Sequence, residues 1–452
     1  MPTPDPSLVF SSTFSEENLL RIFKERISEA KFTGLDGISA SAFSDDAERE
    51  IETAVKKVSS GQYKFTRYRE KLILKNHRKP PRQIAIPTIR DALVLRALCD
   101  YLTEFFDDCR MKPPHDVIKR VASTASAAKD SDCFLRMDVV NFYPSIVHDI
   151  LLAQVSSRVT DPAALALVSL AISTPIGFDE VGEKTVGVPQ GLSISNILSM
   201  VYLREFDDVF LGTLKYYRYV DDIVIVDGCG EVANIHSEIK QYLDSNLRLQ
   251  THPLGDEGGG KSMISVVSEG TDYLGYRISS SGLSIRDKSY KKMFRAIVGC
   301  LRALRGTATS EQVLWRLNLI ITGCRFEERS VGWVLFFRQS TDMAQFHRMD
   351  VFVKKQLGIY GLKHEQGKVK SFVKSYREIR YNRSDTSYVP DFDTFTLADK
   401  IRVISLIRGD SEERLGRMER SEINELYWSI VRRQVSKMEK ETVDFGANSG
   451  GY

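Results

Sequence analysis

Two adjacent carboxylates inside an otherwise apolar stretch restrict the folding of this chain more than any other feature. Asp221 and Asp222 lie in the segment YYRYVDDIVIV, whose remaining residues favour two short strands around a tight turn. Carboxylates at the bend of an apolar hairpin are costly to bury unless a cation neutralises them. The segment therefore predicts either a solvent-exposed Asp-Asp turn, which is a common arrangement, or a cation site, for which magnesium is the natural ion.

A third carboxylate is expected at the end of a neighbouring strand. Asp138 follows the apolar run FLRM and precedes NFYPSI. If the two strands pair, the three carboxylates meet and can hold two divalent ions about 3.5 to 4 Å apart, which is the geometry of phosphoryl transfer. One ion would lower the pKa of a primer 3′-hydroxyl, and the other would hold a triphosphate and the departing pyrophosphate. Taken alone, Asp138 is better explained as a cap or turn residue.

Composition favours a globular, intracellular protein. The 452 residues are 42% hydrophobic, enough for a large core, and no uninterrupted apolar run reaches the length of a membrane span. The N-terminus shows no basic region followed by an apolar block, so we expect no secretory signal and a cytoplasmic location. The six cysteines are scattered without a CxxC pair, which argues against a zinc site or a disulfide framework and predicts reduced core residues. They are Cys99, Cys109, Cys133, Cys229, Cys300 and Cys324.

The net charge of +3 does not by itself indicate a nucleic-acid-binding protein. Lysine and arginine nevertheless cluster in residues 64–82 and again in residues 286–306. Such clusters can neutralise phosphates, although each is equally well explained as the solvated face of a helix or hairpin.

The order of expected elements describes an α+β protein with an antiparallel sheet. Apolar periodicity predicts helices at 15–30, 41–60, 89–108, 148–159, 162–172, 193–211 and 231–245. Alternating apolar runs predict strands at 71–75, 82–86, 134–140, 261–267 and 271–278, and a hairpin at 216–226. From about Ser289 onward the pattern is predominantly helical, and the last residues, GANSGGY, are expected to fray.

Several segments, in order, resemble the reverse transcriptase family. DVVNFYPSI resembles its motif A, GVPQGLSISNILSMVYL its motif B, YVDD its motif C and GGGKSMI its motif D. TDYLGY is similar to the segment that opens the primer grip, and RQIAIPTIRDALVLRAL to the fingers element of bacterial members. The resemblance covers roughly residues 65–280. The ordered set is specific, although each piece alone is not.

The resemblance implies a right-hand polymerase fold, with fingers and a palm that carries the antiparallel sheet, followed by an α-helical thumb and C-terminal region. The implied parts are an N-terminal helical cap (1–60), fingers (61–130), a palm with the catalytic motifs (131–285) and the helical thumb and C-terminal region (286–445).

The resemblance also implies metal ligands and an acid. Asp138 and Asp221 would bridge two Mg²⁺ ions, with Mn²⁺ as a substitute, while Asp222 supports them and the Val139 carbonyl completes a coordination shell. Lys261 would protonate the departing pyrophosphate. The alternative for Lys261 is an ordinary surface lysine in a glycine-rich loop.

Nucleotide contacts follow from the same motifs. Tyr143 occupies the steric-gate position, where a ring under the sugar excludes a 2′-hydroxyl, although a core aromatic is the alternative. Gln190 and Gly191 would lie against the incoming nucleotide and template, or form a plain loop before a helix. Lys75 and Arg82 match the family's triphosphate-binding pair, with Arg82 the safer assignment because other lysines and arginines compete with Lys75.

The segment KVKSFVKSYREIRYNR (368–383) interleaves basic and aromatic residues. We expect Lys370, Lys374 and Arg377 to bind the phosphate backbone of an RNA or an RNA/DNA hybrid. At helical spacing the aromatic residues instead fit a stripe that faces the core, with the basic residues merely solvated.

The leading prediction is an RNA-directed DNA polymerase that uses deoxynucleoside triphosphates and an RNA template, and that acts in anti-phage defence on a dedicated non-coding RNA. By analogy, the bacterial stand-alone enzymes of the defence-associated and abortive-infection groups fit best, and retron enzymes second. A template-independent or protein-primed DNA polymerase and an inactive RNA-binding scaffold are the alternatives. An RNA-dependent RNA polymerase is disfavoured by Tyr143. We expect no membrane association, and a homo-oligomer is left open.

Overall fold

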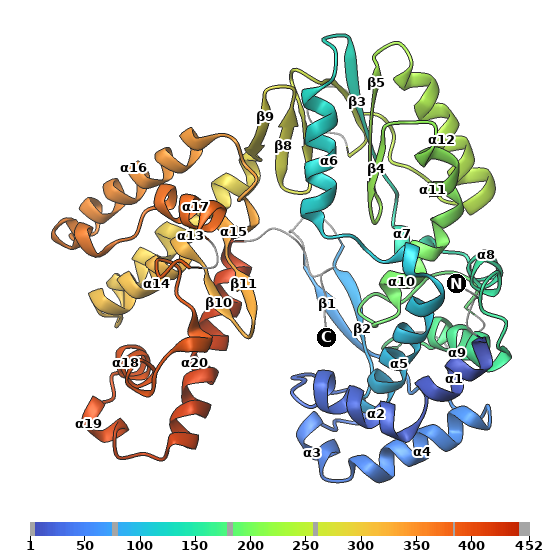
Figure 1. The fold of residues 1–452 in the computed structure, drawn as a ribbon, viewed down its shortest axis with the longest axis horizontal. Coiled ribbons are helices and arrows are strands. Elements are labelled where there is room, and N and C mark those ends of the chain that lie inside the picture. Colours follow the sequence, from blue (N-terminus) through green and yellow to red (C-terminus); the bar gives the residue numbers. More distant parts are fainter. Residues whose placement is uncertain (1–4, 75–79, 179–183, 256–260, 383–384, 443–452) are drawn as a thin grey trace. The chain divides into compact units, whose positions relative to one another are not determined.

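The computed structural model describes residues 5–74, 80–178, 184–255, 261–382 and 385–442 (Figure 1). The described residues divide into two compact units, one within residues 5–117 and 129–267 and the other within residues 118–128 and 268–442. Each unit combines helices with antiparallel strands. The predicted α+β class is therefore confirmed.

The N-terminal segment folds into short helices where two were predicted. These are α1 (Pro6–Thr13), α2 (Glu16–Ile22) with a π-helical turn (Phe23–Ile27), α3 (Ala40–Ser44) and α4 (Ala47–Ser59). Ser15 and Ser39 cap α2 and α3 by accepting backbone N–H bonds, which explains where these helices begin. The predicted helix at 41–60 is interrupted at Asp45 and Asp46, and aspartate is a residue type with low helix propensity.

A β-hairpin and a long helix follow, as predicted. Strands β1 (Arg69–Ile73) and β2 (Arg82–Ile86) pair in antiparallel register, and α5 (Ile89–Phe105) begins where Thr88 accepts a bond from the backbone N–H of Asp91. The buried carboxylate of Asp91 accepts hydrogen bonds from the Tyr63 hydroxyl at 2.8 Å and from the Thr66 N–H at 3.0 Å. Asp91 therefore ties the loop before β1 to α5.

The sheet of the first unit has the strand order β4-β5-β3-β6, and all its pairs are antiparallel. Its strands are β3 (Asp132–Asp138), β4 (Tyr216–Tyr219), β5 (Asp222–Gly228) and β6 (Met263–Val266). Helix α12 (Val232–Leu247) packs against β3, and the interior residues of β3 and β5 are buried. The two central strands are thus well packed, and they fix the positions of the residues at their ends.

The remaining helices of this part of the chain are short. They are the 3-10 turn Asp107–Cys109, α6 (Pro114–Ser126), α7 (Phe142–Ser145), α8 (His148–Ser156), α9 (Pro162–Ser173), α10 (Ser195–Tyr202) and α11 (Arg204–Leu211). The single helix predicted at 193–211 is wrong, because α10 ends at Tyr202 and α11 starts at Arg204. Neither Gly nor Pro marks the break. Tertiary contacts explain it, since the buried Tyr202 hydroxyl donates to the Leu247 carbonyl at 2.6 Å.

The strand predicted at 271–278 is in fact a hairpin. Strands β7 (Thr271–Tyr273) and β8 (Tyr276–Ser279) pair around Leu274 and Gly275, which both have positive φ, at 44° and 88°. Two successive residues with positive φ match the twist of a two-residue hairpin turn. With β9 (Gly282–Ile285) these strands form a separate three-stranded sheet in the second unit.

The rest of the second unit is mostly helical. Its helices are α13 (Asp287–Arg302), α14 (Ser310–Thr322), α15 (Trp333–Phe336), α16 (Met343–Ile359), α17 (Phe372–Tyr381), α18 (Leu397–Arg408), α19 (Glu412–Leu415) and α20 (Arg420–Thr442). Three 3-10 turns (Ala303–Arg305, Lys363–Lys368, Phe392–Thr394) and the small hairpin β10 (Cys324–Phe326) and β11 (Arg329–Val331) complete it. The fully buried Trp333 packs against Phe337, Phe346 and Phe372 at the centre of its core.

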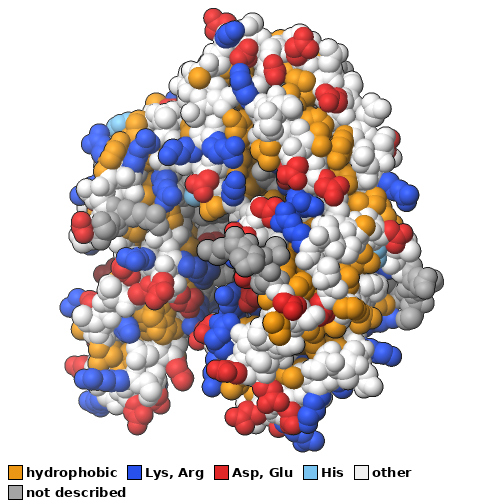
Figure 2. Space-filling model, turned by 45° about the vertical axis from the view of Figure 1, so that its right-hand side comes forward, with side chains coloured by type: hydrophobic (Ala, Val, Ile, Leu, Met, Phe, Trp, Pro, Cys, Tyr) orange, Lys and Arg blue, Asp and Glu red, His pale blue; other side chains and the backbone are white. Residues whose placement is uncertain are grey.

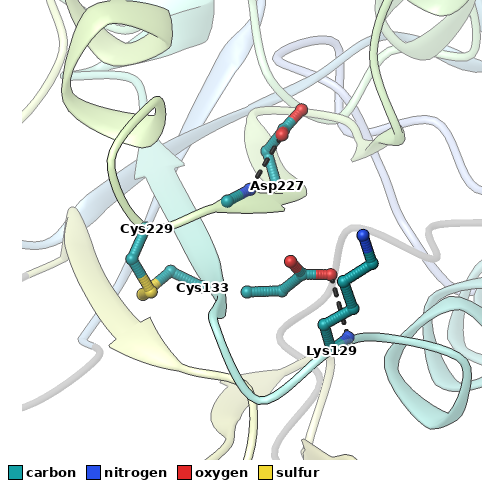
Figure 3. The surroundings of a disulfide bond; sticks show 6 residues. Lys129, Cys133, Asp227 and Cys229 are labelled. Atoms are coloured by element: carbon teal, nitrogen blue, oxygen red, sulfur yellow. Dashed lines mark hydrogen bonds between the residues drawn. A yellow bond between two sulfur atoms is a disulfide. The ribbon is translucent and has the colours of Figure 1, made fainter.

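One disulfide overturns the prediction that every cysteine is reduced. Cys133 on β3 is bonded to Cys229, which directly follows β5 (Figure 3). The two cysteines are 96 residues apart in sequence, but antiparallel pairing of β3 with β5 places their Cα atoms 4.9 Å apart. The other four cysteines are free, as predicted.

The surface is mixed in charge. Lys and Arg side chains are interspersed with Asp and Glu on the face shown in Figure 2, in agreement with the small net charge of +3. Within the described residues, no helix is long and apolar enough to cross a membrane.

Candidate active site

Three carboxylates come together where β3 ends and β5 begins. Asp138 is the last residue of β3 and lies directly opposite Asp222, the first residue of β5. Asp221 precedes it in the two-residue turn that joins β4 to β5. The prediction that the two strands are neighbours is therefore confirmed, and with it the expectation that Asp138 meets the Asp pair.

Asp221 is the member of this cluster whose pKa is clearly raised. Burial and the adjacent charges of Asp138 and Asp222 raise the pKa of its carboxyl from 3.8 to about 6. Each of these causes penalises the ionised form, because a charge is taken from water and placed beside two like charges. A bound cation would remove that penalty, so the electrostatics fit a cation site.

Asp222 is held by an arginine that the sequence analysis did not single out. The Arg136 guanidinium donates from Nε to one carboxylate oxygen at 3.0 Å and from an Nη to the other at 3.2 Å. Both side chains are 19% exposed. Arg136 lies two residues before Asp138 on β3, so both side chains point to the same face of the strand. A charged residue inside a buried strand was the available signal.

Asp138 is paired with Lys261. The lysine ammonium donates to a carboxylate oxygen of Asp138, and His252 Nε2 lies 3.0 Å from the same lysine nitrogen and 3.5 Å from that oxygen. The structure thus brings Lys261 to the carboxylates, as the predicted role requires. His252 was missed, since nothing around it in the sequence marks a site.

The donor set fits Mg²⁺, although two of its members are engaged by basic side chains. Carboxylate oxygens are the ligands that Mg²⁺ prefers. Within the described ranges, no group of three His, Cys, Asp or Glu side chains is arranged to hold a metal ion as the side chains stand. Lys261 pairs with the Asp138 carboxylate, and Arg136 pairs with that of Asp222. A bound metal ion would contact the same carboxylates. Metal binding at this cluster would therefore replace an ion pair with a basic side chain by a bond to the metal ion.

The backbone after Asp138 is fixed by a segment that follows α12. Val139 forms an isolated antiparallel bridge with Thr251. The Asp138 carbonyl accepts from the His252 N–H at 2.9 Å, and the Val140 N–H donates to the Gln250 carbonyl at 2.8 Å. Neither of these two bonds uses the Val139 carbonyl, which was predicted to complete a metal shell.

Tyr143 is buried beside this cluster. Its hydroxyl donates to the Asn196 side chain on α10 at 2.9 Å and accepts from Ser199 at 3.4 Å. Burial raises the pKa of Tyr143 to about 12, and the charges of Asp221 and Arg82 also act on it. Two hydrogen bonds thus anchor the Tyr143 hydroxyl to α10.

The Gln190-Gly191 loop lies against β2. The Ala85 N–H donates to the Gln190 carbonyl at 2.7 Å. Gly191 has φ +105°, and a Cβ there would lie 2.6 Å from the Ile84 side chain and 2.8 Å from the Ala85 carbonyl oxygen. Only glycine permits this approach. The Oε1 atom of Gln190 is buried and has no hydrogen-bond partner within the described part of the chain, so it is available to a ligand.

Of the predicted triphosphate-binding pair, only Arg82 can be placed. It begins β2 opposite Ile73, on the strand that contacts the Gln190-Gly191 loop. Lys75 lies outside the described residues.

The three predicted nucleic-acid-binding residues, Lys374 and Arg377 on α17 and Lys370 just before it, have different surroundings. Lys374 and Arg377 are exposed, whereas Lys370 is half-buried, donates to the Tyr388 carbonyl, and has its pKa lowered by burial and by Lys374. The nitrogens of Lys370 and Lys374 lie 4.8 and 4.6 Å from the centre of the Tyr388 ring. The aromatic stripe of α17 is buried, as the core-facing alternative predicts, at Phe372, Tyr376 and Ile379.

Comparison with known proteins finds one family that matches the central part of the chain. Residues 73–278 match the family described as reverse transcriptase (RNA-dependent DNA polymerase). Protein YkfC of Escherichia coli is 23% identical in an alignment 338 residues long that covers 63% of this chain and 85% of that protein. An uncharacterized 91 kDa protein in the cob intron of Schizosaccharomyces pombe is 27% identical over 173 residues, which is 36% of this chain and 21% of that protein.

Two solved telomerase structures are also similar. That of Candida albicans, in complex with a fragment of telomeric RNA, has a TM-score of 0.40 and 11% identity over 90% of this chain and 64% of that chain. That of Candida tropicalis, truncated from the C-terminal domain, has a TM-score of 0.38 and 12% identity over 55% of this chain and 61% of that chain. This chain therefore spans less than two thirds of either telomerase.

Proposed function

Because residues 73–278 form a reverse transcriptase domain, we propose that this chain is an active RNA-directed DNA polymerase that joins deoxynucleotides to a growing DNA strand. The observation that supports the proposal most strongly is the meeting of Asp138, Asp221 and Asp222 at adjacent strand ends. A cluster of carboxylates in which burial and the neighbouring charges raise the pKa of Asp221 to about 6 is suited to bind divalent cations.

Asp138 and Asp221 would hold two Mg²⁺ ions, or Mn²⁺ in their place, and Asp222 would support them. Bound divalent ions supply charge neutralisation for a phosphoryl transfer and favour the ionised form of a primer 3′-hydroxyl. Lys261, which contacts Asp138, would donate a proton to the departing pyrophosphate. The carbonyl of Val139 is an additional oxygen donor beside Asp138.

The buried Tyr143 ring and the Gln190-Gly191 loop would form the nucleotide pocket. A ring held at its hydroxyl by Asn196 cannot move aside, so it would exclude a ribose 2′-hydroxyl. The unpartnered Gln190 Oε1 would accept a hydrogen bond from the substrate. Arg82 would contact the triphosphate bidentately, and Lys75 would add a second positive charge.

A primer-extension assay tests the proposal. Wild-type protein with an RNA template, a DNA primer and Mg²⁺ should incorporate deoxynucleotides, and Tyr143→Ala should lower the ratio of kcat/KM for deoxy over ribo substrates by about tenfold or more. Extension without a template would instead favour a template-independent or protein-primed polymerase. If the protein binds RNA but incorporates no nucleotide, the result would favour the alternative of an inactive RNA-binding scaffold.

The biological setting is a further part of the proposal. The match covers 85% of a bacterial protein but 21% of an intron-encoded one, which supports a stand-alone bacterial type. We assign it a role in anti-phage defence, with a dedicated non-coding RNA as template. Sequencing of the nucleic acid that copurifies with the protein would identify that RNA, and a random mixture of host transcripts would contradict the assignment.

Helix α17 would add a grip on the nucleic-acid backbone. Lys374 and Arg377 are exposed, and Lys370 would contribute once it is released from Tyr388. Replacing all three by Ala should lower RNA affinity and reduce the salt dependence of binding by about one unit of slope per lost contact. An unchanged salt dependence of RNA binding would show that α17 contributes only to the packing of the core.

A further inference from the structure

A buried ion pair lies beneath the turn that carries the Asp pair. The Arg218 side chain on β4 is 3% exposed, and its Nε donates to a carboxylate oxygen of Asp207 on α11 at 2.8 Å, while an Nη donates to the other oxygen. The Tyr216 hydroxyl donates to the same carboxylate at 2.7 Å. A charge at this depth is costly unless its donors are satisfied, so the guanidinium orientation is closely determined.

The residue between Tyr219 and Asp221 is held in an unfavourable conformation. Val220 has φ +57°, in the left-handed region, and its side chain is 4% exposed. A β-branched residue at positive φ is a real outlier, because its side chain crowds the backbone. Such a conformation persists only when its surroundings hold it, and it costs on the order of 1–3 kcal/mol.

The remaining Nη of Arg218 connects these two features. It donates to the Val220 carbonyl oxygen at 2.7 Å and lies 3.4 Å from the Met200 sulfur on α10. Helix α11 packs against β4 (Figure 1). One planar guanidinium thus links α11, α10 and the peptide group that immediately precedes Asp221.

We propose that Arg218 is a positioning residue that holds Val220 in its left-handed conformation and thereby fixes where the Asp221 and Asp222 carboxylates point. The proposal rests on the proposed polymerase function. Arg218 touches no carboxylate of the candidate active site, so it acts through the backbone of the turn.

The geometry makes a specific demand on the side chain. An arginine presents parallel donors to the Asp207 carboxylate and still has a donor for the Val220 carbonyl, whereas a lysine supplies one nitrogen at a single point. Arg218→Lys keeps the buried charge and should lose the link to the turn. Val220→Gly removes the strain, because glycine adopts positive φ without a side-chain clash.

Arg158 offers a control with the same bonding pattern in a more exposed setting, since its side chain is 34% exposed. Its guanidinium also pairs bidentately with a carboxylate, that of Asp108, and donates to a backbone carbonyl, that of Phe105 at 3.1 Å. It lies between α8 and α9 and outside the carboxylate cluster. Arg158→Lys therefore repeats the chemical change without touching the turn.

The experiment compares Arg218→Lys, Arg158→Lys, Val220→Gly and Arg218→Lys/Val220→Gly. Hydrogen–deuterium exchange of residues 216–226 in metal-free protein measures how firmly the turn is held. The kcat and KM for deoxynucleotide incorporation measure the effect on catalysis. Arg218→Lys should speed exchange in the turn and lower kcat by about tenfold or more, with KM changed by less than about threefold. Adding Val220→Gly should restore part of the lost kcat, and Arg158→Lys should change neither quantity.

Equal effects of Arg218→Lys and Arg158→Lys, or a double variant no better than Arg218→Lys, would overturn the proposal. If Arg218→Lys does not fold, Asp207→Asn replaces it, since its amide oxygen keeps one acceptor for the guanidinium. Unchanged exchange in the turn of Asp207→Asn would then count against the proposal. Because exchange is measured without metal or substrate, it tests the positioning role even where the wild type incorporates no nucleotide, a result that would contradict only the proposed function.

Discussion

The β3–β5 ladder is held in different ways at its two ends. At one end the Cys133–Cys229 disulfide joins the strands covalently (Figure 3). The Cys229 N–H adds a hydrogen bond to the Ser131 carbonyl at 2.9 Å. At the other end the strands carry ion pairs, one between Arg136 and Asp222 and one between Asp138 and Lys261. A covalent bond does not respond to cations, whereas an ion pair can be exchanged. The ladder is therefore fixed at the end away from the carboxylates and adjustable at the end that carries them.

Loss of the disulfide should have the largest effect on stability. Cys133→Ala/Cys229→Ala should lower the free energy of unfolding by about 2–4 kcal/mol, because the bond closes a long loop in the unfolded chain. Urea unfolding of the wild type with and without reductant should show the same difference, and the variant should not respond to reductant. Titration of six thiols in the denatured, unreduced wild type, where four are expected, would contradict the disulfide.

Breaking the Arg136–Asp222 pair should have a smaller effect. Arg136→Met should lower the free energy of unfolding by about 1–3 kcal/mol, since it leaves a largely buried carboxylate without its bidentate partner. Arg277→Met is the control, because its pair with Asp272 is exposed at 49% and 36% and should contribute less than about 1 kcal/mol. Equal effects of the two substitutions would show that Arg136 does not support Asp222.

Replacement of Asp221 should change stability in the opposite direction. Its pKa of about 6 lies above the ordinary 3.8, so the folded state binds this proton more tightly and stability should fall as pH rises through that interval. Asp221→Asn resembles the protonated form and should be about 1–3 kcal/mol more stable than the wild type in metal-free buffer at pH 7 and above. The gain should vanish near pH 4. A gain that is independent of pH would contradict the assignment.

Local patterns made the carboxylate end predictable from the sequence. The hairpin around Asp221 and Asp222 depends on neighbouring residues, and Asp138 could be placed because an apolar run ends there. Gly191 was expected to allow a close backbone approach to the nucleotide and template, whereas its contact with β2 was not predicted.

Long-range pairings were not predictable in the same way. The disulfide joins residues 96 positions apart, and cysteine spacing alone says nothing about which strands are neighbours. Arg136 reaches Asp222 across the same ladder, and His252 approaches Lys261 from a loop after α12. The break between α10 and α11 depends on the contact of Tyr202 with Leu247, which overrides a continuous helical pattern.

The central claim is that this end of the ladder is a divalent-cation site formed by Asp138 and Asp221. Titration with Mn²⁺, followed by the electron paramagnetic resonance signal of the free ion, measures that property without substrate or turnover. We predict that the wild type binds Mn²⁺, that Asp138→Asn and Asp221→Asn each weaken binding by about tenfold or more, and that the control Asp272→Asn in β7 does not. Equal Mn²⁺ binding by the wild type, Asp138→Asn and Asp221→Asn would contradict the claim.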